Sequence, residues 1–267
     1  MAADGGRSTY RIPRFEPLED RIVLDGVPDV EIIGPDAVQL GEQNVAYTLE
    51  FDNVGADTGY VPYVDLILPS TGEDGDDGVT FDSASFLGTT IATTVLNFDT
   101  NGEVVHPFVV DALGDPLIVT GNPGDQLVVL ELPYGSFSPG NPAVDIDIVL
   151  DFSPLADLDQ AQDITAIGGF ALGCDPLDNP TSDAPIRGTP TVSSIDQNLF
   201  TVEKVNNAPE ADGATGPSYP YEYTLTVEVA DGQTLTDFVL TDTLPPEIVY
   251  LGNVAISGGV GTIMQEP

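Results

Sequence analysis

Short runs of alternating apolar and polar residues, separated by turn-forming residues, constrain the fold of this chain more than any other feature. Residues 45–51 (VAYTLEF) alternate in this way and end at the turn-forming residues Asp52, Asn53 and Gly55. A period of two residues places the apolar side chains of a strand on one face, so each such run predicts a half-buried β-strand. A period of 3.6 residues is nowhere sustained over a dozen positions, and residues 155–164 are the only stretch in which a short helix could form. The sequence therefore predicts an all-β fold.

Further strand candidates follow at the spacing that is typical of antiparallel β-sandwiches. These candidates are residues 63–69, 104–110, 116–120, 126–132, 144–152, 200–205, 223–229 and 238–245. Loops rich in Gly, Pro, Asn and Asp separate them, and residues 174–190 mark a longer break in composition. We therefore expect a flexible N-terminal arm over residues 1–27, an elaborated sandwich over residues 28–190 and a partial unit over residues 191–267.

Acidic residues greatly outnumber basic ones, and this balance limits the partners of the protein. The chain has 44 Asp and Glu against 6 Lys and Arg, a formal net charge of −38, while hydrophobic residues still make up 41% and can fill a core. Such a charge repels nucleic-acid phosphates and anionic lipid surfaces. It suits salty surroundings outside a cell, where ions screen the repulsion between carboxylates. No run of about 18 apolar residues is present, so we expect no membrane-spanning segment.

Three reactive side chains occur singly in the part of the chain that follows the N-terminal arm. Cys174 is the only cysteine and His106 the only histidine, which excludes an intrachain disulfide and a multi-histidine metal centre. His106 lies within a strand candidate and no Gly-x-Ser-x-Gly motif is present, so it is interpreted as a structural or solvent-exposed histidine. Cys174 is followed by Asp175, which disfavours a thiolate, and is interpreted as inert. Lys204, the only lysine, is either a surface residue or a partner of an Asn in an intramolecular amide bond. We expect no catalytic residue and no enzymatic activity.

The N-terminal arm contains a short motif, in residues 15–24 (FEPLEDRIVL). This segment resembles the LEPR-XLL motif of very large exported bacterial proteins. The residues that match are Leu18, Glu19, Arg21 and Leu24. The motif has Pro at the position of Asp20 and Leu at the position of Val23, so the match is partial. The resemblance implies a role of the arm in export or surface sorting.

A second motif covers Tyr-Thr-Leu-Thr-Val at residues 223–227 and Val-Leu-Thr-Asp-Thr-Leu-Pro at residues 239–245. These residues resemble the extracellular repeat known as domain of unknown function eleven. Residues 45–51 and 64–69 repeat the same order of strand, turn and strand ending in Leu-Pro, in a looser form. The resemblance implies immunoglobulin-like modules strung along large surface proteins. The expected fold is therefore a tandem of immunoglobulin-like antiparallel β-sandwiches, the first elaborated and the second incomplete.

Calcium is the cofactor that the acidic loops favour, because Ca²⁺ prefers carboxylate oxygens. The first candidate site is a glycine-punctuated loop with Glu73, Asp74, Asp76 and Asp77. The second candidate is the cluster of Asp157, Asp159 and Asp163. Neither has the spacing of an EF-hand, and solvated acidic loops are the alternative interpretation.

These observations predict a non-enzymatic structural or adhesive segment of a large exported cell-surface protein, stabilised by cations. Its expected partners are the cell surface, the extracellular matrix or another copy of the chain. One alternative is a carbohydrate-binding or accessory module of a secreted enzyme. Exposed aromatic side chains would favour it, and the candidates are Tyr60, Tyr63, Tyr134 and Phe137. The other alternative is a subunit of a surface filament or layer that assembles by strand addition.

Overall fold

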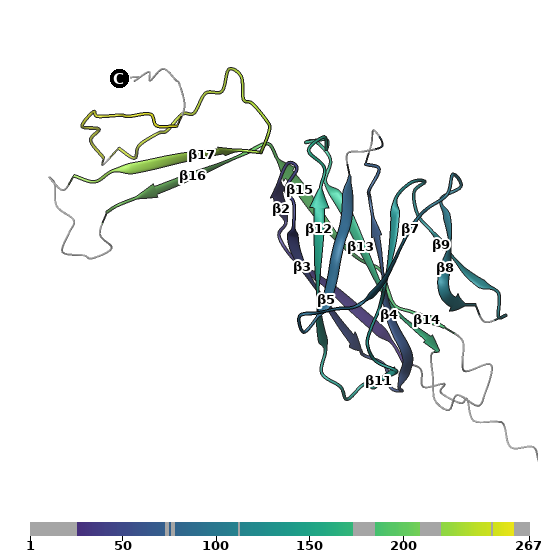
Figure 1. The fold of residues 1–267 in the computed structure, drawn as a ribbon. Helices are drawn as coiled ribbons and strands as arrows, with labels where there is room; N and C mark the ends of the chain where they lie inside the picture. The colour runs from purple at the N-terminus through teal and green to yellow at the C-terminus, as the bar shows by residue number, and fades with distance from the viewer. Residues whose placement is uncertain are drawn as a thin grey trace, which may run out of the picture. The chain divides into compact units, whose positions relative to one another are not determined.

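The computed structural model describes residues 26–72, 75, 78–111, 113–172, 185–208, 220–246 and 248–258. These residues form 17 β-strands and no helix, so none of them belongs to a helix that could cross a bilayer. Most of the strands gather in one body, a β-sandwich of two sheets (Figure 1). The prediction of an all-β fold is confirmed.

Five strands make up the first sheet of the sandwich. Their order is β1 (Pro28–Ile33), β3 (Val45–Asn53), β12 (Val144–Phe152), β5 (Val79–Phe86) and β6 (Thr89–Thr90). All neighbours in this sheet are antiparallel. The predicted alternation in β3 is observed, because Tyr47, Leu49 and Phe51 are buried and the side chains between them are half-buried or exposed. One face of the sheet is therefore apolar and the other is polar.

The second sheet has eight strands. Along its main path the order is β2 (Ala37–Gln39), β15 (Thr191–Asn198), β13 (Gln162–Leu172), β4 (Gly59–Leu68), β10 (Gln126–Glu131) and β7 (Ala92–Asn97). Two short strands join it from the side, β11 (Ser136–Phe137) on β4 and β14 (Ile186–Arg187) on β13. All pairs are antiparallel except β2 with β15, which is parallel.

The main core lies between these two sheets. Phe51 of the first sheet is fully buried and packs edge-on against the rings of Phe137 and Phe170 of the second, with ring centroids 5.4 and 5.8 Å apart. Aliphatic side chains from both sheets, such as Leu66 and Ile146, fill the same cluster. The interior is thus formed by the apolar side chains of the alternating runs that predict strands.

A separate two-stranded ribbon covers the outer face of the eight-stranded sheet. It consists of β8 (Glu103–Val110) and β9 (Pro116–Thr120), which pair with each other and with no other strand of the described residues. Val109 and Val119 of the ribbon pack with Tyr63, Leu127 and Val129 in a second buried cluster. β4 and β10 are covered on both faces. Their sequences are therefore mostly continuous apolar runs and do not alternate.

The first sandwich extends further along the chain than expected. Residues 191–198 were assigned to the second unit, but they form β15, which pairs with both β13 and β2 of the eight-stranded sheet. The turn-rich stretch before residue 190 is therefore followed by one more strand of the sandwich. Pro and Gly in that stretch mark a loop within the domain, and composition alone does not distinguish such a loop from a linker.

The described residues after the sandwich contain two strands, β16 (Phe200–Asn206) and β17 (Tyr223–Val229), which form an antiparallel hairpin. The prediction of a strand at residues 238–245 is wrong, since these residues are not in a strand. The corresponding strands of the first sandwich, β3 and β4, lie in opposite sheets. A strand at 238–245 would therefore need neighbours of its own in a second sheet, and the described residues contain none after β17. By compactness the chain divides after Gln233, so β16 and β17 belong to the unit of residues 1–233, and residues 234–267 form the other unit.

Candidate functional site

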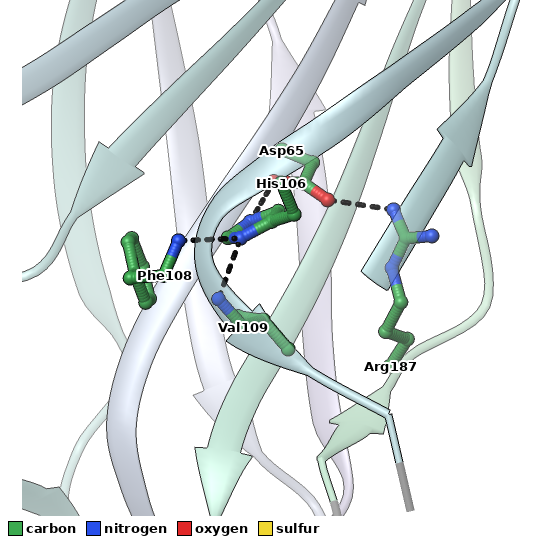
Figure 2. A network of polar contacts seen from close by, with 5 residues as sticks. All are labelled: Asp65, His106, Phe108, Val109 and Arg187. Atoms are coloured by element: carbon green, nitrogen blue, oxygen red, sulfur yellow. Dashed lines mark hydrogen bonds and ion pairs between the residues drawn. The ribbon is translucent and has the colours of Figure 1, made fainter. Parts of the chain in front are cut away.

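A buried carboxylate lies in the middle of β4. Asp65 is fully buried within the otherwise apolar stretch of that strand. Its Oδ1 lies 3.1 Å from Nε2 of His106, and its Oδ2 lies 2.6 Å from a terminal guanidinium nitrogen of Arg187. Figure 2 shows His106 reaching the carboxylate from the ribbon and Arg187 reaching it from β14. A buried carboxylate needs a charge partner and hydrogen-bond donors, and Asp65 has both. We call these three residues the Asp65 cluster.

An interruption in the ribbon turns His106 toward Asp65. The pairing of β8 with β9 shifts register between Val105 and Val110. Pro107 lies inside the interruption and has no N–H to donate to a strand ladder. The backbone N–H groups of Phe108 and Val109 donate instead to Nδ1 of His106, with N···N distances of 3.4 and 3.1 Å (Figure 2). The local backbone therefore holds the imidazole at Nδ1, and Asp65 of β4 holds it at Nε2.

These hydrogen bonds determine the tautomer of His106. Nδ1 accepts two N–H bonds and so carries no proton, which places the ring proton on Nε2, where it is donated to Asp65. Both ring nitrogens are therefore engaged within the fold. A general base needs a free lone pair within reach of the proton that it removes, and His106 offers none in this arrangement. The interpretation of His106 as a structural histidine is supported.

Tyr63 completes the buried surroundings of the Asp65 cluster. Its ring lies 5.0 Å from that of His106 and 5.6 Å from that of Phe108, centroid to centroid. Gly169 allows this position, because a Cβ on residue 169 would lie 2.1 Å from Cζ of Tyr63. The hydroxyl is buried and has no hydrogen-bond partner. Burial raises the pKa of Tyr63 well above its usual range, and the nearby Asp65 carboxylate raises it further, while Arg187 acts in the opposite direction.

Alkaline pH is expected to destabilise the protein through Tyr63. In the unfolded chain a tyrosine ionises near pH 10.0, whereas the folded pKa is higher. The stabilising contribution is thus fully present below pH 10.0 and is lost as the pH rises toward the folded pKa, by at most about 1.4 kcal/mol per pH unit. Urea unfolding between pH 8 and pH 11.5 measures this loss. Tyr63→Phe should be at least as stable as the parent at pH 8 and should lose less stability above pH 10. Equal pH dependence in the two proteins would contradict the assignment.

A cavity of about 570 Å³ lies where the loops after β4, β9 and β12 meet. Asp125, Asp157 and Asp163 contribute to its lining. Both carboxylate oxygens of Asp125 accept hydrogen bonds from the protein. Oδ1 accepts one from the hydroxyl of Thr71 at 2.8 Å, and Oδ2 accepts one from the side-chain amide of Asn122 at 3.1 Å. Oδ2 of Asp157 is buried and has no hydrogen-bond partner.

The structure brings together part of the second calcium candidate. Asp157 and Asp163 line the cavity, while Asp159 does not. Asp163 accepts a short hydrogen bond from the hydroxyl of Ser194. No three Asp, Glu, His or Cys side chains converge on a point that could hold a metal ion anywhere in the described ranges. A calcium site at these residues therefore stays a prediction.

Several other candidates lie outside the described residues. Those of the first calcium candidate are Glu73, Asp74, Asp76 and Asp77. Gly72 and Gly75, which flank them, lie at the wall of the cavity. Cys174 and the N-terminal motif at residues 15–24 also fall outside.

The aromatic side chains that would favour sugar binding are mostly not available for it. Tyr63 and Phe137 are buried in the two cores and cannot stack on a sugar ring. Tyr60 and Tyr134 are half-buried, and the ring of Tyr134 packs edge-on against Phe86 and Phe137. Two of the four candidates are therefore not exposed platforms, and the other two are only half-exposed.

Lys204 lies in an exposed position on β16. Its Nζ is 4.3 Å from the centre of the Tyr223 ring, a cation–π contact across the hairpin. An intramolecular amide bond would need a buried lysine next to an Asn and a protonated acid. The exposed setting favours the alternative interpretation, a surface lysine.

Comparison with known proteins adds distant structural likenesses. No protein-family model matches the sequence, and no curated protein matches it. Among solved structures, AvmM, which catalyses macrocyclization in alchivemycin A biosynthesis, is 16% identical with a TM-score of 0.36, over 64% of this chain and 88% of AvmM. The sixth cohesin of scaffoldin B from Acetivibrio cellulolyticus is 10% identical with a TM-score of 0.34, over 64% and 99% of the chains. The major pilin subunit BcpA of Bacillus cereus is 11% identical with a TM-score of 0.33, over 70% and 45%.

Sequence reasoning missed the roles of Asp65 and Arg187. One signal was available, because Asp65 is a lone carboxylate within the apolar run Tyr63–Leu68. A charge in such a run implies a buried partner. The identity of that partner could not be read from the sequence, since Arg187 lies 122 residues away from Asp65.

Proposed function

We propose that this chain is a non-enzymatic structural or adhesive segment of a large exported cell-surface protein. The observation that carries the proposal is that the only histidine of the chain, His106, has a structural role. Both ring nitrogens of His106 are bonded inside the fold, so the side chain best suited to acid–base chemistry attaches a ribbon to a sheet. The described part of the chain contains a two-sheet sandwich, and the chain has a large excess of carboxylates, as expected for a spacer in salty surroundings. The N-terminal resemblance to an export motif supports the location.

The location can be tested directly in the source cells. An antibody raised against the purified chain should label intact, unpermeabilised cells, and external protease should remove the signal. A cytosolic marker protein provides the control for cell integrity. Labelling that appears only after permeabilisation would contradict an exported surface protein.

The proposal includes stabilisation by cations, because the fold itself cannot neutralise its carboxylates. Of the 44 acidic residues only five precede Gly26, whereas four of the six basic residues do. Arg187 is already paired with Asp65, which leaves Lys204 as the only other Lys or Arg after the arm. Divalent cations are the counterions that carboxylates bind best, and extracellular calcium modules bind Ca²⁺ with Kd values of about 10⁻⁴–10⁻³ M.

Calcium is expected to raise the thermal midpoint of the purified chain. At about 10 mM Ca²⁺ and a Kd of about 1 mM, the stabilisation is about 1.4 kcal/mol, or about 3–6 °C for a domain of this size. Calorimetry in CaCl₂, in NaCl of equal ionic strength and in excess chelator measures the shift. Asp157→Asn/Asp163→Asn tests the cavity as the site, with Asp145→Asn/Asp147→Asn on the exposed face of β12 as the matched control. Equal midpoints in CaCl₂ and NaCl would contradict specific calcium stabilisation.

Assembly by strand addition is the alternative that a particular observation favours. The hairpin of β16 and β17 is a two-stranded sheet, and neither strand pairs with another strand of the described residues.

A further inference from the structure

The β16–β17 hairpin has two edges at which another strand could be added. Its strands pair with each other over their full length, from Phe200 with Val229 to Asn206 with Tyr223, and Figure 1 shows them as a ribbon of two strands. A two-stranded sheet is only marginally stable in water, and three or more strands with a common apolar face are needed for independent stability. An edge also presents backbone N–H and C=O groups that can pair with another chain.

The two edges differ in how well they are protected against such pairing. Natural edge strands are commonly protected by charged residues, proline or a bulge. β16 carries adjacent charges at Glu203 and Lys204 in its centre. β17, with the sequence YTLTVEV, has no proline or basic residue, shows no bulge against β16, and has Glu228 as its only charge. Its residues are mainly β-branched and aromatic, the types that strands favour. β17 is thus the less protected edge.

We propose that two copies of this chain pair through the edges of β17, antiparallel, about a two-fold axis at Thr226. In this register all seven residues of β17 are paired with the second copy. Tyr223 lies opposite Val229 of the second copy and Leu225 opposite its Val227, on the apolar face. On the polar face, Thr224 lies opposite Glu228 of the second copy, and the Thr226 residues of the two copies lie opposite each other.

Symmetry limits the registers that are possible. A two-fold axis perpendicular to an antiparallel sheet keeps each side chain on its own face, so a residue can pair only with itself or with one an even number of positions away. Among such registers of β17, the one centred on Thr226 gives the full overlap and opposes no like charges. For β16, registers centred on Glu203 or Lys204 oppose like charges, and one centred on Val202 pairs only residues 200–204. The sequence of β17 is therefore self-complementary in a way that β16 is not.

Charge opposes a second copy less at the edge of β17 than elsewhere on the chain. Copies with a net charge of −38 repel each other over most of their surfaces. At the β17 edge each copy contributes one carboxylate, Glu228, and the register places it opposite the hydroxyl of Thr224. The remaining repulsion is screened over about 10 Å at 0.1 M salt and about 3 Å at 1 M salt. The pairing should therefore strengthen as the salt concentration rises.

The product would be one four-stranded sheet, in the order β16, β17, β17 and β16. One face of this sheet carries Tyr223, Leu225, Val227 and Val229 with Phe200 and Val202, from both copies, and the outer strands add Lys204 and Asn206 to the same face. This satisfies the requirement for more than two strands. The inference extends the proposed structural role by naming the partner, and it predicts pairing of the isolated chain whatever the result of the surface labelling.

A disulfide across the axis tests the register. In a Cys174→Ser background, Thr226→Cys should form a covalent dimer on mild oxidation, because residues opposite each other in an antiparallel pair have Cα atoms about 4.5–5.5 Å apart and a disulfide spans about 4.4–6.8 Å. Val202→Cys in the same background is the matched control, since Val202 would lie on the axis if β16 were the paired edge. Non-reducing electrophoresis should show a dimer for Thr226→Cys and a monomer for Val202→Cys. The reverse result, or no dimer from either variant, would overturn the proposal.

A charge on the axis tests the same contact without a covalent bond. Thr226→Lys places two lysines opposite each other in the dimer, while within the hairpin the new lysine lies opposite Glu203. Thr201→Lys on β16 is the matched control, because it lies opposite Glu228 within the hairpin and away from the β17 edge. Light scattering of the parent chain should give a dimer fraction that rises with NaCl. Thr226→Lys should raise the dimer Kd at least about tenfold and Thr201→Lys should leave it unchanged. Equal effects of the two variants, or a parent that stays monomeric at all salt concentrations, would refute pairing through β17.

Discussion

Replacing Asp65 with alanine is expected to lower the free energy of unfolding by about 3 kcal/mol. The variant leaves the Nε2–H of His106 and the guanidinium of Arg187 without their carboxylate. Removing one partner of a buried ion pair costs about 3–5 kcal/mol. The lower end applies here because the side chain of Arg187 is 27% exposed and can turn toward water. Urea denaturation at neutral pH gives the difference.

Asp145→Ala is the matched control for Asp65→Ala. It removes a carboxylate group of the same kind from Asp145, which lies at an exposed position on β12. In a chain with this excess of negative charge, loss of an exposed carboxylate relieves repulsion, so the control should be neutral or slightly stabilising. If Asp65→Ala cost less than about 1 kcal/mol, the Asp65 cluster would not be what holds the ribbon to the sheet.

Phe51→Ala is expected to be at least as destabilising, by about 3–5 kcal/mol. Phe51 is fully buried where the two sheets face each other, and its removal leaves the rings of Phe137 and Phe170 without their common neighbour. For a domain of about 150–250 residues, such a loss lowers the thermal midpoint by about 10 °C. Calorimetry of the parent and variant chains measures the shift.

Two further variants separate loss of packing from a general effect of mutation. Phe51→Leu keeps most of the buried volume and should fall between the parent and Phe51→Ala. Val54→Ala, at a side chain that is 58% exposed just after β3, should change stability by less than about 0.5 kcal/mol. A midpoint of Phe51→Ala within 2 °C of the parent would mean that this aromatic contact is not central to the core.

Strand positions could be predicted well where a strand is covered on one face. The alternation at residues 45–51 identifies most of β3, and the same pattern identifies β12 and β17. It failed at residues 238–245, a run rich in strand-favouring residues that has no neighbouring strand in the described residues. Alternation reports which side chains could share a face, whereas a strand also needs a partner for its backbone. For the same reason the pattern did not reveal that residues 191–198 complete the first sandwich.

The candidate site could be predicted only in part, because its members come together through the topology. His106 was singled out as the only histidine, but its burial depends on an interruption in β8 that places it over Asp65. Asp65 lies on β4 and Arg187 on β14, two strands that come close because both pair with β13 in the folded sheet. Acidic loops drew attention to calcium, yet the structure divides the second cluster, with Asp159 off the cavity that Asp157 and Asp163 line.

The ribbon of β8 and β9 has a consequence for how the protein opens locally. In the part of the chain that the structure describes, its strands pair only with each other, and it contacts the sheet beneath through side chains such as Val109, Val119 and His106, which contacts Asp65. It can therefore detach as one cooperative segment while every hydrogen bond of the sandwich ladders stays intact. Amide protons of the ribbon should accordingly exchange with solvent by a lower-energy route than those of β4. Detachment would also uncover Tyr63, Leu127 and Val129, an apolar surface through which copies of the chain could associate.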